Sequence, residues 1–140
     1  PQVTGTFLGQ CAEYCGTQHA RMLLRVIVHE PDDFERWAAA QRAPAASDPS
    51  VAEGRAIFQR TACVNCHSLD GTIADGRFGP DLTHLMSRTT IGAGAALNTP
   101  ENLRAWIEDP NTFKPGVLMP AMKLDDEQID KLTAFLVTLK

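Results

Sequence analysis

Cys63-Val64-Asn65-Cys66-His67 decides how this chain of 140 residues is interpreted. The pattern C-x-x-C-H is the attachment signature of a c-type haem. Two cysteines three residues apart on a helical turn present their thiols to the two vinyl groups of one porphyrin, and the adjacent histidine faces the iron from the same side. A bare C-x-x-C would also suit a redox thiol pair, a disulfide or zinc, but zinc needs two further Cys or His ligands at matching spacing. We therefore predict one covalent haem on Cys63 and Cys66, with His67 as an axial ligand.

A second axial ligand is predicted in the segment Lys114-Pro115-Gly116-Val117-Leu118-Met119-Pro120. Met119 precedes a proline, which favours an extended backbone, and Gly116 permits close approach to a porphyrin edge. Met122 is the rival ligand. A Met/His pair raises the haem potential and fills both axial positions, which favours electron transfer over oxygen binding or peroxidase-like chemistry. Of the other candidates, Met86 is expected in the core and His84 at the surface of a short helix over 81–88.

The sequence after residue 50 is patterned for helices. Ser50 and Glu53 form a capping-box pattern, which predicts a helix to about Arg60. Thr99 before Pro100 predicts a helix to about Glu108. Asp125 with Gln128 predicts the cap of a last helix, whose apolar residues keep three-to-four spacing: Ile129, Leu132, Phe135, Leu136 and Leu139. Loops are expected over 68–80 and 110–123.

The first 50 residues have a different pattern. Residues 22–28 are apolar and β-branched and predict a strand. One strand is not stable alone, and no other convincing strand is predicted, which indicates the end of a β domain. A helix is expected over 31–42, followed by a linker over 43–50 that is rich in Ala, Pro and Ser.

Residues 50–140 resemble a class I cytochrome c domain. The resemblance is carried by the capped helix with Gly54 and Phe58, by C-x-x-C-H, by residues 78–82 (Phe-Gly-Pro-Asp-Leu), by the Met119 segment and by the last helix. It implies a mainly α fold of three to five helices around one haem. It also implies that the carbonyl of Pro80 accepts a hydrogen bond from His67, that Gly54 permits a close helix crossing near Phe135, and that Trp106 lines the haem pocket. Ordinary core packing is the alternative for Trp106.

A second constellation precedes the strand. Residues 11–22 read C-x-E-x-C-x-x-x-H-x-x-M, and thiolate, imidazole and thioether together suit copper. A Cys11–Cys15 disulfide is the alternative. The segment resembles the dinuclear CuA loop of cytochrome c oxidase subunit II. The resemblance implies bridging ligation by Cys11 and Cys15, terminal ligation by His19 and Met22, and a weak ligand in the carbonyl of Glu13. The CuA family needs another histidine. His29 is badly placed for that role and is expected to be exposed, so we expect an incomplete CuA centre in this chain alone.

The two resemblances together imply three segments: 1–30 as the C-terminal part of a cupredoxin-like CuA domain, 31–49 as a helix and linker, and 50–140 as the cytochrome c domain. This order resembles subunit II of a caa-type haem-copper oxidase. The chain would be an electron-transfer module with no catalytic residues of its own. It would pass electrons from a cytochrome, a high-potential iron–sulfur protein or a quinol-oxidising complex to CuA, and on to subunit I, which reduces oxygen to water with proton pumping. A free-standing soluble c-type cytochrome is the alternative.

Composition excludes some classes of function. The net charge of −4 gives no basic surface for nucleic acid, and no apolar run approaches the roughly 18 residues that span a bilayer. The start at Pro1 lacks the pattern of a signal peptide, so a mature or truncated product is expected. The oxidase resemblance places the chain at the periplasmic or outer face of a bacterial membrane, anchored through upstream transmembrane helices.

Overall fold

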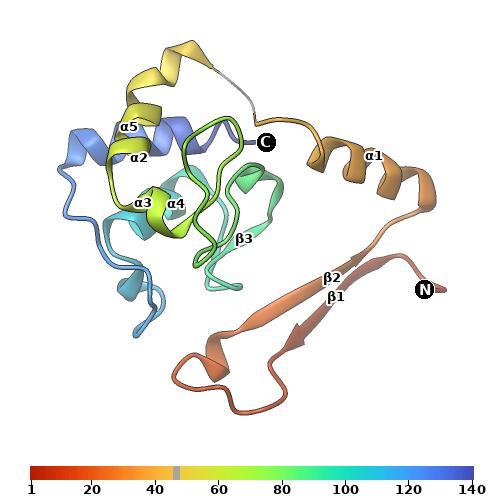
Figure 1. Ribbon diagram of the computed structural model, residues 1–140. Helices are drawn as coiled ribbons and strands as arrows, with labels where there is room; N and C mark the ends of the chain where they lie inside the picture. The colour runs from red at the N-terminus through yellow and green to blue at the C-terminus, as the bar shows by residue number, and fades with distance from the viewer. Residues whose placement is uncertain (46–47) are drawn as a thin grey trace.

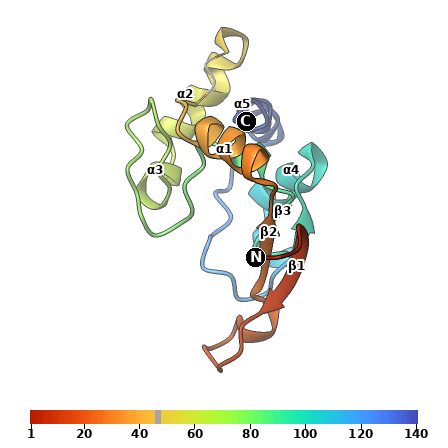
Figure 2. The same cartoon turned by 90° about the vertical axis from the view of Figure 1, so that its right-hand side faces the viewer.

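The computed structural model describes residues 1–45 and 48–140; residues 46–47 of the predicted linker lie outside the described part. A long β-hairpin and a helix come first, and a helical body follows (Figure 1). The hairpin lies beside and below this body, and the helix crosses near its upper end (Figure 2). Within the described ranges, no helix is both long and apolar enough to cross a membrane.

Four α-helices build the body: α2 (Ala52–Arg60), α3 (Cys63–Cys66), α4 (Pro100–Glu108) and α5 (Asp126–Leu136). Residues from α2, α4 and α5 form most of one apolar core with the turns between them, and Phe58 and Leu132 at its centre are each 1% exposed. This burial is the main source of stability for a body with little sheet. The mainly α fold expected for residues 50–140 is confirmed.

The crossing of α2 and α5 depends on Gly54. A Cβ atom at Gly54 would collide with the carbonyl oxygen of Lys131, which is backbone and cannot move aside as a side chain can. The rings of Phe58 and Phe135 pack beside this contact with centroids 6.1 Å apart. The glycine thus permits the close approach of the two helices that bury the core.

Helix caps follow the sequence at α4 and α5 but not at α2. Thr99 Oγ1 accepts a hydrogen bond from the Asn102 amide (3.2 Å), and the capping box of Asp125 with Gln128 is formed. The predicted Ser50 capping box is wrong, because α2 begins at Ala52 without a side-chain cap. Asp48 instead accepts from the amide and hydroxyl of Ser50 and caps a 3-10 turn over Pro49–Val51. The Asp48 carboxylate accepts the hydrogen bond from the Ser50 amide, so Asp48 and not Ser50 acts as the cap at this end.

The strand expected over 22–28 is β2 (Leu23–Val28), and it has a partner that the sequence did not predict. β1 (Gly5–Gln10) pairs with it antiparallel, with Gly5 opposite Val28 and Gln10 opposite Leu23. Two glycines in six residues weaken the strand signal of β1, and only its pairing reveals it. No residue of either strand is fully buried.

The helix expected over 31–42 is α1 (Pro31–Gln41), with Arg42 as its C-terminal cap. None of its side chains is buried. His29 stacks on Trp37 with ring centroids 6.3 Å apart and is half-buried, so the prediction of an exposed histidine is wrong. Phe34 completes this aromatic group.

The region after the haem motif differs from prediction at three places. The helix expected over 81–88 is only a 3-10 turn at Leu85–Ser87, followed by the short hairpin β3 (Thr90–Ile91) and β4 (Ala96–Leu97). The loop expected over 110–123 opens with a 3-10 turn at Pro110–Thr112. The surface position predicted for His84 is wrong, because its ring is buried between the carbonyl oxygens of Lys140 (2.7 Å) and Ala43 (3.0 Å). Met86, as expected, packs against the core.

Candidate haem site and copper loop

Helix α3 is a single turn that carries both cysteines of C-x-x-C-H. Cys63 and Cys66 are half-buried, and the amide of His67 donates to the Cys63 carbonyl (2.9 Å) as the helix ends. Burial raises the pKa of the Cys63 thiol against a weaker opposing effect of its contact with Thr61. A thiol with a raised pKa is a weaker nucleophile, which does not favour a redox role for Cys63.

The ring of His67 is held by the turn that contains Pro80. His67 Nδ1 lies 2.7 Å from the Pro80 carbonyl oxygen, which can only accept. Nδ1 therefore carries the proton, and Nε2 keeps a free lone pair for a metal. A Cβ atom at Gly79 would lie 2.5 Å from the Cε1 atom of His67, so the turn can approach the ring this closely only with glycine.

Asp81 braces the same turn. Its carboxylate accepts from the Ser68 hydroxyl (2.6 Å) and from the Thr83 amide (2.8 Å). Burial opposes ionisation of Asp81, but these hydrogen bonds, together with the charge of Arg88, outweigh it and lower the carboxyl pKa. The ionised form of Asp81 thus helps to keep the Pro80 carbonyl against His67.

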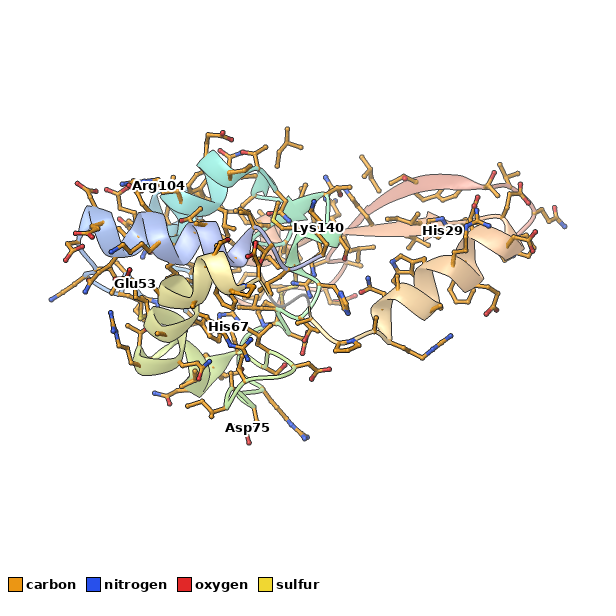
Figure 3. The ribbon with its side chains drawn as sticks, turned by 90° about the horizontal axis from the view of Figure 1, so that it is seen from above. His29, Glu53, His67, Asp75, Arg104 and Lys140 are labelled. Carbon is orange, nitrogen blue, oxygen red and sulfur yellow. The ribbon has the colours of Figure 1, made fainter. Side chains whose placement is uncertain are left out.

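Substitution of Asp81 by Asn is expected to lower the free energy of unfolding by about 1 kcal/mol at neutral pH. The folded-state pKa is depressed, so the contribution of Asp81 is complete above the ordinary aspartate pKa and is lost as pH falls through the folded value. The stabilities of the two proteins, measured by thermal unfolding, should therefore converge only at pH values below the ordinary aspartate pKa. Asp75→Asn is the control, because this exposed side chain lies at the tip of the same loop (Figure 3). An equal loss in both variants, or no convergence in acid, would contradict the role of Asp81.

Met119 has a specific partner in α4. The indole N–H of Trp106 donates to Met119 Sδ (3.2 Å), and the Trp106 ring packs against Phe113 with centroids 6.1 Å apart. Met122 is half-buried like Met119, so burial does not separate the two methionines, whereas the Trp106 hydrogen bond does. A thioether sulfur has two lone pairs, so it can accept from Trp106 and ligate a metal with the other.

A buried lysine supplies positive charge near the Met119 segment. Lys114 is 7% exposed and its Nζ donates to the Gly92 carbonyl (3.1 Å). Burial lowers the pKa of Lys114, and the nearby charge of Arg21 lowers it further. No pattern in the sequence predicts the burial of Lys114.

The predicted haem ligands offer the donor atoms that a haem c needs. His67 offers Nε2, α3 offers two thiols on one turn, and Met119 offers a sulfur held in place by Trp106. The loops on both sides carry large apolar side chains that are at least 70% exposed: Ile73, Phe78 and Leu118. A flat apolar ring bound between the loops would cover such side chains and remove them from water.

The copper loop brings together three of its predicted ligands. The sulfur atoms of Cys11 and Cys15 are 3.4 Å apart, and Cys15 Sγ lies 3.9 Å from His19 Nδ1. The Cys11 thiol donates to the Glu13 carbonyl (3.1 Å), so this oxygen faces the cluster as expected for a weak ligand. The contact with Cys11 raises the pKa of the Cys15 thiol, so copper would have to displace a proton there. The donor set suits copper.

Met22 and His29, the two other residues considered as copper ligands, differ in their distance from this cluster. The Met22 side chain is 40% exposed, and Met22 closes the loop through its backbone carbonyl, which accepts from the Cys11 amide. Within residues 1–45 and 48–140, no further His, Cys, Asp or Glu joins the three clustered ligands. His29 follows the far end of β2, about 17 Å along the strand from Leu23, and cannot reach them.

Known proteins are similar to most of this chain. A family model described as "Cytochrome c" matches residues 51–140. Cytochrome c oxidase subunit 2 of Bacillus sp. (strain PS3) is 40% identical over 97% of this chain, and that of Alkalihalophilus pseudofirmus is 37% identical over 97%. The chain spans 40% of the length of each of these relatives. Among solved structures, the c-type cytochrome SorU from Sinorhizobium meliloti has a TM-score of 0.46 and 27% identity, covering 64% of this chain and 88% of that one.

The match to the family model spans the four helices of the body, the C-x-x-C-H motif, the Pro80 turn and the Met119 segment. It implies a covalently bound haem c. The chain belongs to the cytochrome c family.

Proposed function

We propose that this chain carries single electrons between a haem on residues 63–67 and a copper centre built on residues 11–22. The observation that supports this most directly is the presence of two such ligand clusters in one chain. One is α3 with His67 turned by Pro80, and the other is the cluster of Cys11, Cys15 and His19. Each cluster offers soft or imidazole ligands of the kind that hold one-electron centres.

In this proposal the chain's residues attach the haem, orient its ligands and shield its iron. The thiols of Cys63 and Cys66 each add across a vinyl double bond, which forms a C–S and a C–H bond and needs no oxidant. His67 and Met119 would both hold the haem iron, which would leave no ligand position for oxygen. When bound, the haem supplies a site for one electron. The N–H of Trp106 withdraws electron density from the Met119 sulfur, which favours the reduced iron.

We further propose that the chain works within a cytochrome c oxidase. The similarity to two proteins named cytochrome c oxidase subunit 2 supports membership of such an oxidoreductase complex. In this arrangement residues 50–140 are the cytochrome c domain, 31–49 the connection and 1–30 the end of a CuA domain. Electrons from an external donor would pass to subunit I, which reduces oxygen to water with proton pumping. The site would lie at the periplasmic or outer face of a bacterial membrane.

Metal analysis and optical redox titration of the haem-loaded chain test this function. We expect one iron per chain and a titration curve that follows a single one-electron step. The reduced protein should bind carbon monoxide poorly, because both axial positions are filled. Ready binding of carbon monoxide would indicate an open iron position and would contradict the electron-carrier assignment.

Copper loading of the same protein tests the second centre. We expect no multi-line hyperfine pattern of a mixed-valence copper pair in electron paramagnetic resonance, because the copper loop of this chain supplies one imidazole. A variant with Cys11→Ser and Cys15→Ser gives the background of adventitious copper. A mixed-valence pattern from this chain alone would contradict the expected incompleteness, and copper uptake equal to that of the variant would favour the free-standing carrier.

A further inference from the structure

The copper loop contacts the Met119 segment directly. The side-chain amide of Gln18 donates from Nε2 to the carbonyl oxygen of Pro115 at 2.8 Å, across 97 residues of sequence. Gln18 directly precedes His19, and Pro115 lies four residues before Met119. One hydrogen bond therefore joins two loops that each carry a predicted metal ligand.

The chemistry of this contact fixes the orientation of the Gln18 amide. The Pro115 carbonyl can only accept, so the group that faces it must be the NH₂ of Gln18. Gln18 Oε1 is then buried without a hydrogen-bond partner among the described residues. A buried acceptor without a partner costs free energy, so the hydrogen bond from the Gln18 NH₂ group forms against an opposing cost. Packing alone does not explain why a side chain with this cost is present, whereas the hydrogen bond from Gln18 Nε2 to Pro115 does.

The backbone of the Met119 segment is shaped for this approach. Gly116 has φ +82°, a conformation that favours glycine, and an added Cβ would lie 3.1 Å from Thr17 Cγ2 and 3.3 Å from Gln18 Nε2. Its amide donates to the Asn111 side chain (3.1 Å), which holds the turn in place. The two loops thus meet with little room for larger side chains.

Two further hydrogen bonds anchor β2 beside the same region of the body. The Leu23 amide donates to the Ala93 carbonyl (3.0 Å), and Arg25 donates to Thr90 Oγ1 (2.8 Å). These contacts hold the strand that follows the copper loop against the turn of the β3–β4 hairpin. The copper loop is therefore held at its end by β2 and at Gln18 by Pro115.

We propose that Gln18 is a positioning residue that docks the copper loop on the Met119 segment and provides a continuous bonded route for the electron between the two centres. This inference rests on the proposed function. The transfer oxidises the reduced haem iron by one electron and reduces the copper centre by one electron, with no proton or bond moved. The route runs from His19 through the backbone to Gln18, across the hydrogen bond to Pro115, and along four residues to Met119.

The docking contact is tested by hydrogen exchange in the haem-loaded chain with Gln18→Leu, which removes the donor and keeps most of the volume. Loss of a hydrogen bond of about 1 kcal/mol is expected to speed amide exchange in residues 11–22 by about fivefold. Gln10→Leu is the matched control, because exposed Gln10 directly precedes Cys11 as Gln18 precedes His19. Equal exchange in both variants would overturn the docking role.

The electron route is tested with a ruthenium ammine complex bound to the imidazole of His19. After photoreduction of the label, one electron passes to the oxidised haem, and this rate is expected to fall several-fold with Gln18→Leu but not with Gln10→Leu. A label on His29 is the internal control, because it lies well away from His67 (Figure 3) and its rate should not respond to Gln18. An unchanged His19 rate would overturn the proposal. The iron–sulfur absorption band of the unlabelled protein reports on Met119 ligation separately, so failure of the proposed function is distinguishable.

Discussion

Haem is expected to stay with the polypeptide through acid–acetone extraction, and to be lost from a variant with Cys63→Ser and Cys66→Ser. Thioether bonds survive acid, whereas axial ligation by His67 does not, because acid protonates the imidazole. The measurement is the haem absorption of the protein pellet after extraction. The effect should be complete, since neither serine hydroxyl forms a stable bond to the porphyrin.

The control for this experiment is the variant with Cys11→Ser and Cys15→Ser. These cysteines lie in the copper loop, so their loss should leave haem attachment unchanged. Single substitutions at Cys63 and Cys66 should each leave one thioether and therefore an attached haem with a shifted absorption maximum. Extraction of haem from the unaltered chain would refute covalent attachment.

Replacing Met119 by Leu is expected to abolish the iron–sulfur charge-transfer band and to lower the haem potential. Leucine matches the volume of methionine but offers no lone pair to the iron. The fall should be an appreciable part of the roughly 0.8 V over which axial ligands tune haem proteins. Absorption spectroscopy and potentiometric titration measure the two effects.

Two other variants separate ligation from packing. Met122→Leu should change neither the band nor the potential, and the reverse outcome would move the assignment to Met122. Trp106→Phe removes the N–H that donates to Met119 Sδ while keeping the contact with Phe113. It should keep the band and lower the potential by less than Met119→Leu does. A potential unchanged in Trp106→Phe would assign Trp106 to packing alone.

The features predicted from sequence were those with local causes. Thr99 and Asp125 accept hydrogen bonds from amides three residues ahead, so the starts of α4 and α5 could be predicted. The same holds for the placement of Cys63 and Cys66 on one turn.

The features that were missed depend on distant contacts. β1 is held by pairing with β2, and the ring of His84 is buried by carbonyls 41 and 56 residues away. The Gln18–Pro115 hydrogen bond spans 97 residues, and no local pattern marks it. The cap at Asp48 was missed for a local reason. Asp48 lies two residues before Ser50 and is the stronger acceptor, so it acts as the cap that was predicted for Ser50.

The contacts of β2 and of His84 have a consequence for kinetics. The Leu23 amide donates to the Ala93 carbonyl, and His84 lies within hydrogen-bond distance of the Ala43 carbonyl. With the Gln18–Pro115 contact, the first part of the chain meets the helical body at several separate points. A module held at several points does not move freely relative to the body, so its partner is present at a fixed effective concentration. The proposed transfer between the two loops would then be unimolecular. It would not depend on protein concentration and, unlike an encounter between separate carriers, it would gain little from electrostatic steering.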